Sequence, residues 1–148
     1  MRPMLAAAAL GALTLLTACA TAPSGPATGG WSYGYDASAG LATATLREPS
    51  GQVTTTFTCR PPSGDLVITD RTLRGGSATI QIGAFSTRAD ARGGSPLTLA
   101  FPQSPPLLAA ARGGEEMSIT AGGGTHRLAP GAAQKLREVA DACWPQGS

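Results

Sequence analysis

The residues equipped for acid–base or nucleophilic chemistry are few and scattered. The chain has 148 residues, with a single histidine, His126, and nine Asp and Glu side chains. A catalytic histidine needs an orienting carboxylate and a nucleophile, and no G-x-S-x-G or comparable motif surrounds His126. Six of these carboxylates are scattered in predicted turns, where solvated side chains are expected. They are Asp36, Asp65, Asp70, Asp90, Glu115 and Glu116. We therefore predict no catalytic residue and expect His126 to be a surface or hairpin histidine.

The most specific pattern surrounds Cys19. Arg2 precedes an apolar run over residues 4–16, and Leu16-Thr17-Ala18-Cys19 closes that run. As a helix the run spans about 20 Å, which is short of the ~30 Å hydrocarbon core of a membrane. The segment resembles the signal peptide and lipobox of bacterial lipoproteins. An ordinary secretory signal, with Cys19 as an incidental thiol, is the alternative.

The lipoprotein resemblance implies cleavage before Cys19 and a diacylglycerol on its sulfur, with a further acyl chain such as palmitate on the new amino terminus. The membrane is then a partner through these chains. Ala20 follows Cys19, where inner-membrane lipoproteins have an aspartate. The resemblance thus favours the cell envelope, at the periplasmic face of the outer membrane.

Length and charge limit the number of domains and the kinds of partner that the rest of the chain can have. The 130 residues from Cys19 onward suffice for one domain. Without Arg2 the chain has ten basic and nine acidic side chains, so a nucleic-acid partner is not expected. We assign residues 1–18 to a signal peptide, residues 19–30 to the lipidated cysteine and a flexible tether, and residues 31–148 to a single β-rich domain.

Alternating apolar and polar residues predict strands along most of the domain. We expect strands over residues 31–35, 41–47, 52–59, 65–69, 78–82, 97–101, 115–120 and 125–128, and a loop over residues 88–95. A short helix is expected over residues 107–112 and a longer one from about residue 130 to 143. The fold class predicted is mostly β: a small antiparallel sandwich or partly open barrel of about seven to eight strands with a C-terminal helix.

Cys59 and Cys143 form an even pair downstream of Cys19. Cys59 should end a strand on its apolar face, and Cys143 should lie on the apolar face of the last helix. Behind an export signal these two buried thiols are expected to oxidise to a disulfide. One histidine and two oxidised cysteines do not supply the three or four ligands of a metal site, so neither metal nor cofactor is predicted.

An aromatic stripe opens the domain. Trp31, Tyr33 and Tyr35 alternate with small or polar residues and share one face of the first strand. The simpler interpretation is a core face, since buried aromatic residues are the rule in small β domains. If exposed, the stripe could stack on sugar rings or bind a protein partner.

Two further resemblances concern the body of the domain. Phe57-Thr58-Cys59, followed by Gly64-Asp65-Leu66-Val67-Ile68, resembles the early half of β-barrel lipoprotein inhibitors of c-type lysozyme, which also have a second cysteine near the end. The Ser-Gly-x-x-Tyr inhibitory loop of that family is absent from the sequence. The tail, residues 114–143, looks like small uncharacterised periplasmic proteins of alphaproteobacteria.

Three function classes follow. The tether, the neutral β domain and the missing catalytic motif favour a non-enzymatic envelope lipoprotein that binds an envelope protein or glycan, or supports an assembly. An inhibitor of a wall-degrading enzyme such as lysozyme is the first alternative. An envelope hydrolase is the second, and it requires a pocket that holds two carboxylates, or His126 with an acid.

Overall fold

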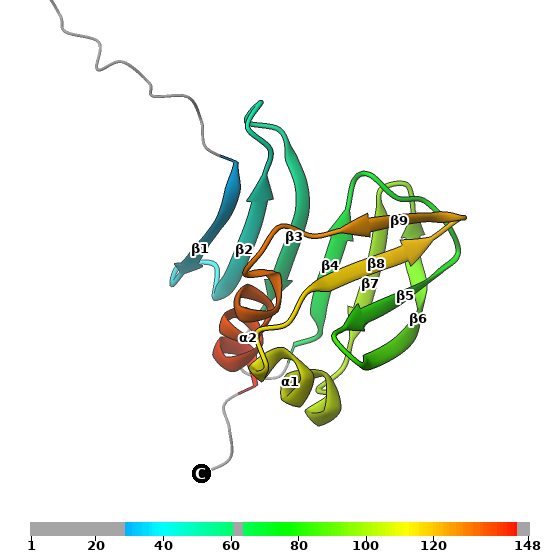
Figure 1. The fold of residues 1–148 in the computed structure, drawn as a ribbon. Coiled ribbons are helices and arrows are strands. Elements are labelled where there is room, and N and C mark those ends of the chain that lie inside the picture. The colour runs from blue at the N-terminus through cyan, green and yellow to red at the C-terminus, as the bar shows by residue number, and fades with distance from the viewer. Residues whose placement is uncertain (1–28, 61–63, 145–148) are drawn as a thin grey trace, which may run out of the picture.

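The computed structural model describes residues 29–60 and 64–144; the lipobox with Cys19 and the tether up to residue 28 lie outside these ranges. The described residues form nine strands and two helices (Figure 1). The strands are β1 (Gly30–Asp36), β2 (Leu41–Arg47), β3 (Val53–Cys59), β4 (Leu66–Asp70), β5 (Ser77–Ile82), β6 (Phe85–Gly94), β7 (Leu97–Phe101), β8 (Met117–Ala121) and β9 (Gly124–Arg127). The helices are α1 (Pro105–Arg112) and α2 (Ala132–Cys143). The prediction of a mostly β domain with a C-terminal helix is confirmed.

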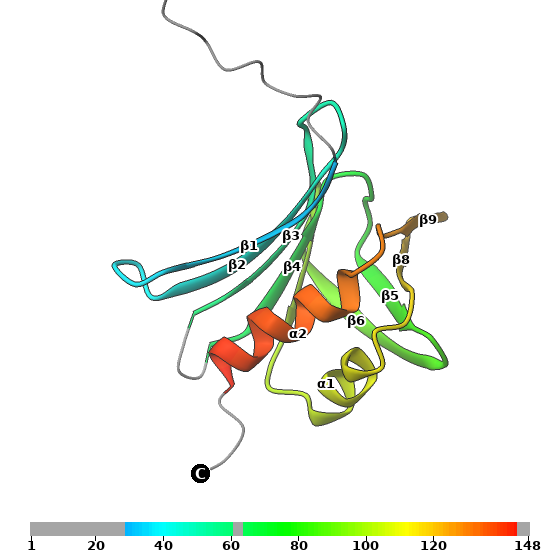
Figure 2. The same cartoon turned by 60° about the vertical axis from the view of Figure 1, so that its left-hand side comes forward.

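All nine strands form one antiparallel sheet in the order β1-β2-β3-β4-β7-β6-β5-β8-β9. The sheet curls into a half-barrel, and α2 lies across its concave side (Figure 2). Of the two alternatives from the sequence, the partly open barrel is therefore the correct one. The edge strands β1 and β9 do not pair with each other within the described residues. Instead Trp31 Nε1 donates a hydrogen bond to the Ala129 carbonyl, which joins β1 to the segment after β9.

The concave face of the sheet is built by strict alternation along the strands. In β2 the side chains of Ala42, Ala44 and Leu46 are buried, and the threonines between them are half-buried on the convex face. Strands β4 and β7 alternate in the same way and add Leu66, Ile68, Leu97 and Leu99 to the core. Since successive side chains point to opposite faces of a strand, this pattern directs the apolar residues toward α2.

Helix α2 covers the concave face with one apolar stripe. Its buried residues are Ala132, Ala133, Leu136, Val139, Ala140 and Cys143, at the spacing of a helix face. The helix begins at Ala132 rather than at about residue 130, because Gly131 has a φ of 89° and turns the chain before the first helical residue. Helix α1 also starts earlier than expected, since Pro105 and Pro106 fit its first turn.

Strand β6 was not predicted from the sequence. Residues 88–95 were expected to be a loop because arginine and glycine are frequent there, whereas β6 continues to Gly94 and pairs with both β5 and β7. Its outward positions are exposed, and the small side chains of Ala89 and Ala91 pack against the core. The strand count is therefore nine rather than seven to eight.

Candidate functional site

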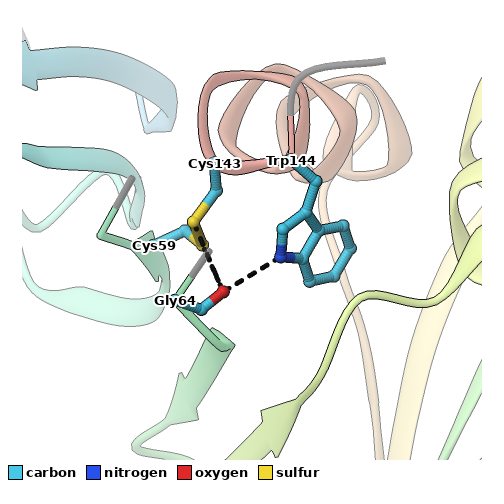
Figure 3. Close-up of a disulfide and its surroundings, with 4 residues drawn as sticks. All are labelled: Cys59, Gly64, Cys143 and Trp144. Atoms are coloured by element: carbon cyan, nitrogen blue, oxygen red, sulfur yellow. Dashed lines mark hydrogen bonds between the residues drawn. A yellow bond between two sulfur atoms is a disulfide. The ribbon is translucent and has the colours of Figure 1, made fainter. Parts of the chain in front are cut away.

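The predicted cysteine pair is confirmed. Cys59 ends β3 and Cys143 ends α2, and the two are disulfide-bonded with Cα atoms 5.7 Å apart (Figure 3). Both sulfurs lie within 3.5 Å of the Gly64 carbonyl oxygen. Because disulfide sulfurs have no hydrogen to donate, we regard these as packing contacts. The hydrogen bond at this place comes from Trp144, whose Nε1 donates to the Gly64 carbonyl at 2.9 Å.

This arrangement links distant parts of the chain and has a structural role. Cys59, Cys143 and Trp144 are all almost fully buried. The disulfide holds the end of α2 against the end of β3, and the Trp144 hydrogen bond holds it against Gly64, just before β4. Trp144 had no assigned role in the sequence, because its bond depends on a carbonyl 80 residues away.

The aromatic stripe of β1 divides into two parts. Trp31 is half-buried and stacks on Phe57, with ring centroids 4.7 Å apart. Tyr33 and Tyr35 are 40% and 54% exposed, and they are the exposed large hydrophobic side chains of the described residues. The core-face interpretation thus holds for Trp31 and is wrong for the two tyrosines.

The two tyrosines form a surface that we call the tyrosine face. They lie opposite Ala44 and Ala42 of β2, whose small side chains leave the rings uncovered. The Lys135 ammonium of α2 lies 5.9 Å from the centroid of the Tyr33 ring, a cation–π distance. A shallow depression of about 390 Å³ runs along the β1–β2 hairpin; besides the two tyrosines, its lining consists of residues of the opposite, convex face, such as Ser32 and Thr43.

The structure brings together His126 and Asp70, which the sequence left unconnected. His126 Nδ1 lies 2.6 Å from Asp70 Oδ2 and links β9 to the end of β4. Asp70 is fully buried, which corrects the expectation of a solvated turn carboxylate. Its Oδ1 accepts hydrogen bonds from the backbone N–H groups of Thr72 and Leu73 and from the Thr72 hydroxyl, and Thr55 donates to Oδ2.

These contacts set the charge of both partners. Burial pushes the pKa of Asp70 upward, but hydrogen bonds from His126 and Thr72 outweigh burial and hold that pKa below its ordinary value. The hydrogen bond to Asp70 raises the pKa of His126 against the effect of burial, and the charges of Asp70 and Glu48 add to the rise. Since an ionised carboxylate only accepts, Nδ1 carries a proton and Nε2 faces away from Asp70.

His126 also lines a pocket at the opening between the two sheet edges, which we call the seam pocket. It has a volume of about 300 Å³, and its lining includes Gly30 at the start of β1, Glu48, Thr54, His126 and Arg127. Thr54 is only 3% exposed, and its hydroxyl has no hydrogen-bond partner among the described residues. Thr54 occupies the irregularity where the β2–β3 register shifts, next to Leu46 and Arg47.

The other carboxylates form no comparable site. Asp36 accepts hydrogen bonds from Ser38 and Ala39 within its own turn, with the Ser38 hydroxyl the main cause of its lowered pKa. Asp65 pairs with Arg92. Within the described residues no group of three or more His, Cys, Asp or Glu side chains is placed to hold a metal ion. No helix among those residues is both long and apolar enough to cross a membrane.

Comparison of the chain with family models, with curated proteins and with solved structures finds no match.

Proposed function

We propose that this chain is a lipid-anchored protein of the bacterial cell envelope, with a non-enzymatic binding role performed by the tyrosine face. The observation that carries the proposal is the exposure of Tyr33 and Tyr35 on an edge strand. Large exposed aromatic side chains mark protein interaction sites, and tyrosine is enriched among the residues that dominate binding energy.

The geometry favours an extended protein segment as the partner. β1 pairs only with β2 among the described strands, so its other side has backbone N–H and C=O groups free to accept a further strand. A segment added along β1 would place alternate side chains against Tyr33 and Tyr35, with Lys135 beside them. Inhibition of a wall-degrading enzyme such as lysozyme would be one form of this role.

The lipid anchor is the second part of the proposal, and the lipobox that ends at Cys19 supports it. Acyl chains on Cys19 would hold the domain at the periplasmic face of the outer membrane, on a tether that enters the fold at Gly30. Replacing Cys19 by serine is expected to abolish incorporation of radiolabelled palmitate and to release the protein from the membrane fraction or leave it unprocessed. Label retained on the Cys19→Ser protein would exclude the lipobox.

Site-specific photo-crosslinking in the producing cells tests the binding role. A benzoylphenylalanine at position 35 is expected to yield one dominant adduct with an envelope protein. The matched control places the same group at Thr43, which lies on the convex face of the adjacent strand. The adduct should disappear when Tyr33 is also changed to serine. Equal adducts from both positions, or adducts to glycan only, would contradict a protein segment on the tyrosine face.

The second candidate, an envelope hydrolase, is favoured by the observation that His126 meets a buried acid beside a pocket. It predicts hydrolysis of ester, amide or glycosidic substrates by the wild-type protein and a loss of at least a hundredfold on His126→Gln, the usual contribution of a general base. A panel of chromogenic substrates, with a lysozyme-inhibition assay in parallel, separates the three function classes.

A further inference from the structure

The outer side of β1 is an unprotected sheet edge. No backbone hydrogen bond of the described residues reaches it, because β1 pairs with β2 alone. Residues 32–36 are exposed on both faces of the strand, and Figure 1 shows β1 at the margin of the fold.

Proteins usually protect such an edge with a lysine, a proline, a bulge or a short strand. None of these protects β1, which is seven residues long and pairs with β2 without a register shift. The opposite edge strand, β9, is only four residues long. A long aromatic edge of this kind is typical of a surface that another strand covers.

The sequence of β1 is complementary to itself. Two copies of β1 can pair antiparallel around a two-fold axis at Gly34. Tyr33 of each copy then lies opposite Tyr35 of the other, because each is one position from the axis. All four rings lie on the concave side, since they share the face of the buried alanines of β2. Each exposed ring thereby gains a cross-strand aromatic neighbour, which stabilises paired strands.

The convex side of the same register is also complementary. Ser32 lies opposite Asp36 of the second copy, each two positions from the axis. Oδ1 of Asp36 accepts hydrogen bonds from Ser38 and Ala39, whereas Oδ2 has no partner among the described residues. The Ser32 hydroxyl can therefore donate to a free carboxylate oxygen across the axis. At the axis Gly34 faces Gly34, so no side chain obstructs the approach of the two strands.

We propose that the partner of the tyrosine face is a second copy of this chain, paired antiparallel through β1 around Gly34. The inference rests on the proposed binding role of this face and names its partner.

The proposed lipid anchor fits such a pair. Residues 20–29 connect Cys19 to Gly30 and can span at most about 35 Å. The two Gly30 residues of the pair lie at its opposite ends, about 27 Å apart along the strands. The anchors of both copies can therefore reach one membrane, where confinement raises the effective concentration of the partner.

A single added cysteine, Gly34→Cys, tests the pairing in the producing cells. The substitution should keep the fold, because no described heavy atom beyond the neighbours of Gly34 in the chain lies within 4 Å of the new Cβ. Cys59 and Cys143 are bonded to each other, and the proposed lipid occupies Cys19, so the new thiol is the free one. Facing residues of antiparallel strands have Cα atoms about 4.5–5.5 Å apart, within the range of a disulfide. After oxidation with diamide we expect a covalent dimer on a non-reducing gel, made only of peptides of this chain and lost on reduction.

Matched variants test the register. The thiol of Ser32→Cys would lie four positions from its mate, about 14 Å along the strands, and Thr43→Cys lies on the convex face of β2. Both should stay monomeric. In the Gly34→Cys background, Tyr35→Lys should lower the yield of dimer about fivefold or more, because each copy loses an aromatic pair and gains a charge. Tyr35 is 54% exposed, so this replacement should keep the fold.

A Gly34→Cys protein that stays monomeric, that dimerises no better than the Ser32→Cys and Thr43→Cys proteins, or whose dimer survives Tyr35→Lys unchanged would overturn the inference. Its failure is distinguishable from failure of the binding role. A photo-adduct at position 35 with a different envelope protein would leave the tyrosine face as the binding surface and exclude only the second copy. A monomeric Gly34→Cys protein together with no adduct at position 35 would exclude both.

Discussion

At the scale of single residues, the His126–Asp70 pair is the contact that sequence reasoning could not supply. The two residues are 56 positions apart, and neither has a local motif around it. Their proximity follows from the curl of the sheet, which turns β9 back toward the end of β4. The same curl buries Asp70, so a residue that looks like a turn carboxylate in the sequence becomes the centre of five hydrogen bonds.

The pair predicts a defined pH dependence of stability. His126 has a raised pKa, so its contribution is complete below its ordinary value of 6.5 and is lost as pH rises through the folded-state pKa. Asp70 has a lowered pKa, so its contribution is present above its ordinary value of 3.8 and is lost as pH falls through the folded-state pKa. The stabilisation by the pair is therefore largest between these two ordinary values.

Asp70→Asn tests this dependence. Urea unfolding of the variant should show a free energy of unfolding lower than wild type by about 1.5–3 kcal/mol near pH 5, the typical contribution of hydrogen bonds to charged groups. The difference should narrow on the alkaline side and again in strong acid. Asp90→Asn, an exposed position on β6, is the control and should follow the wild-type curve. A difference that is constant across pH would contradict an ionised pair.

At the scale of elements, the sequence predicted best where one face of an element is largely apolar. Helix α2 and strands β2, β3, β4 and β7 have such faces, and they were found with small boundary errors. β6 lacks one: its inward residues are threonine, alanine and glycine after Phe85, so its pattern resembles a loop. Pairing with neighbours on both sides holds it in place, and pairing is not visible in a single sequence.

Helix α2 depends on the Cys59–Cys143 disulfide at its end. The bridge closes a loop of 84 residues, for which the chain-entropy model gives up to about 4–5 kcal/mol. We expect Cys143→Ala to lower the free energy of unfolding by several kcal/mol, and amide exchange to accelerate first in the last turn of α2. Ala142→Ser, in the same turn but half-buried, is the control and should cost much less. Unchanged protection of α2 in Cys143→Ala would show that packing alone holds the helix.

At the scale of the whole molecule, the half-barrel must be held together across an opening that backbone pairing does not close. Two side chains do so among the described residues. His126 reaches from β9 to Asp70, and Trp31 reaches from β1 to the Ala129 carbonyl. Both tie an edge strand to another part of the fold, which limits the exposure that open sheet edges otherwise bring. The seam pocket lies beside these two contacts, at the part of the sheet that backbone pairing leaves open.

The variant Trp31→Phe separates the role of the Trp31 hydrogen bond across the opening from the role of the Trp31 ring in core packing. The ring remains available to stack on Phe57, while the hydrogen bond from Nε1 to the Ala129 carbonyl, 3.2 Å long, is lost. We expect a loss of about 0.5–1.5 kcal/mol in the free energy of unfolding. Because the bond joins β1 to the segment between β9 and α2, amide exchange should accelerate on both sides of the opening and stay unchanged in β4 and β7. Faster exchange confined to β1 would show that the Trp31 bond does not hold the two edges of the half-barrel together.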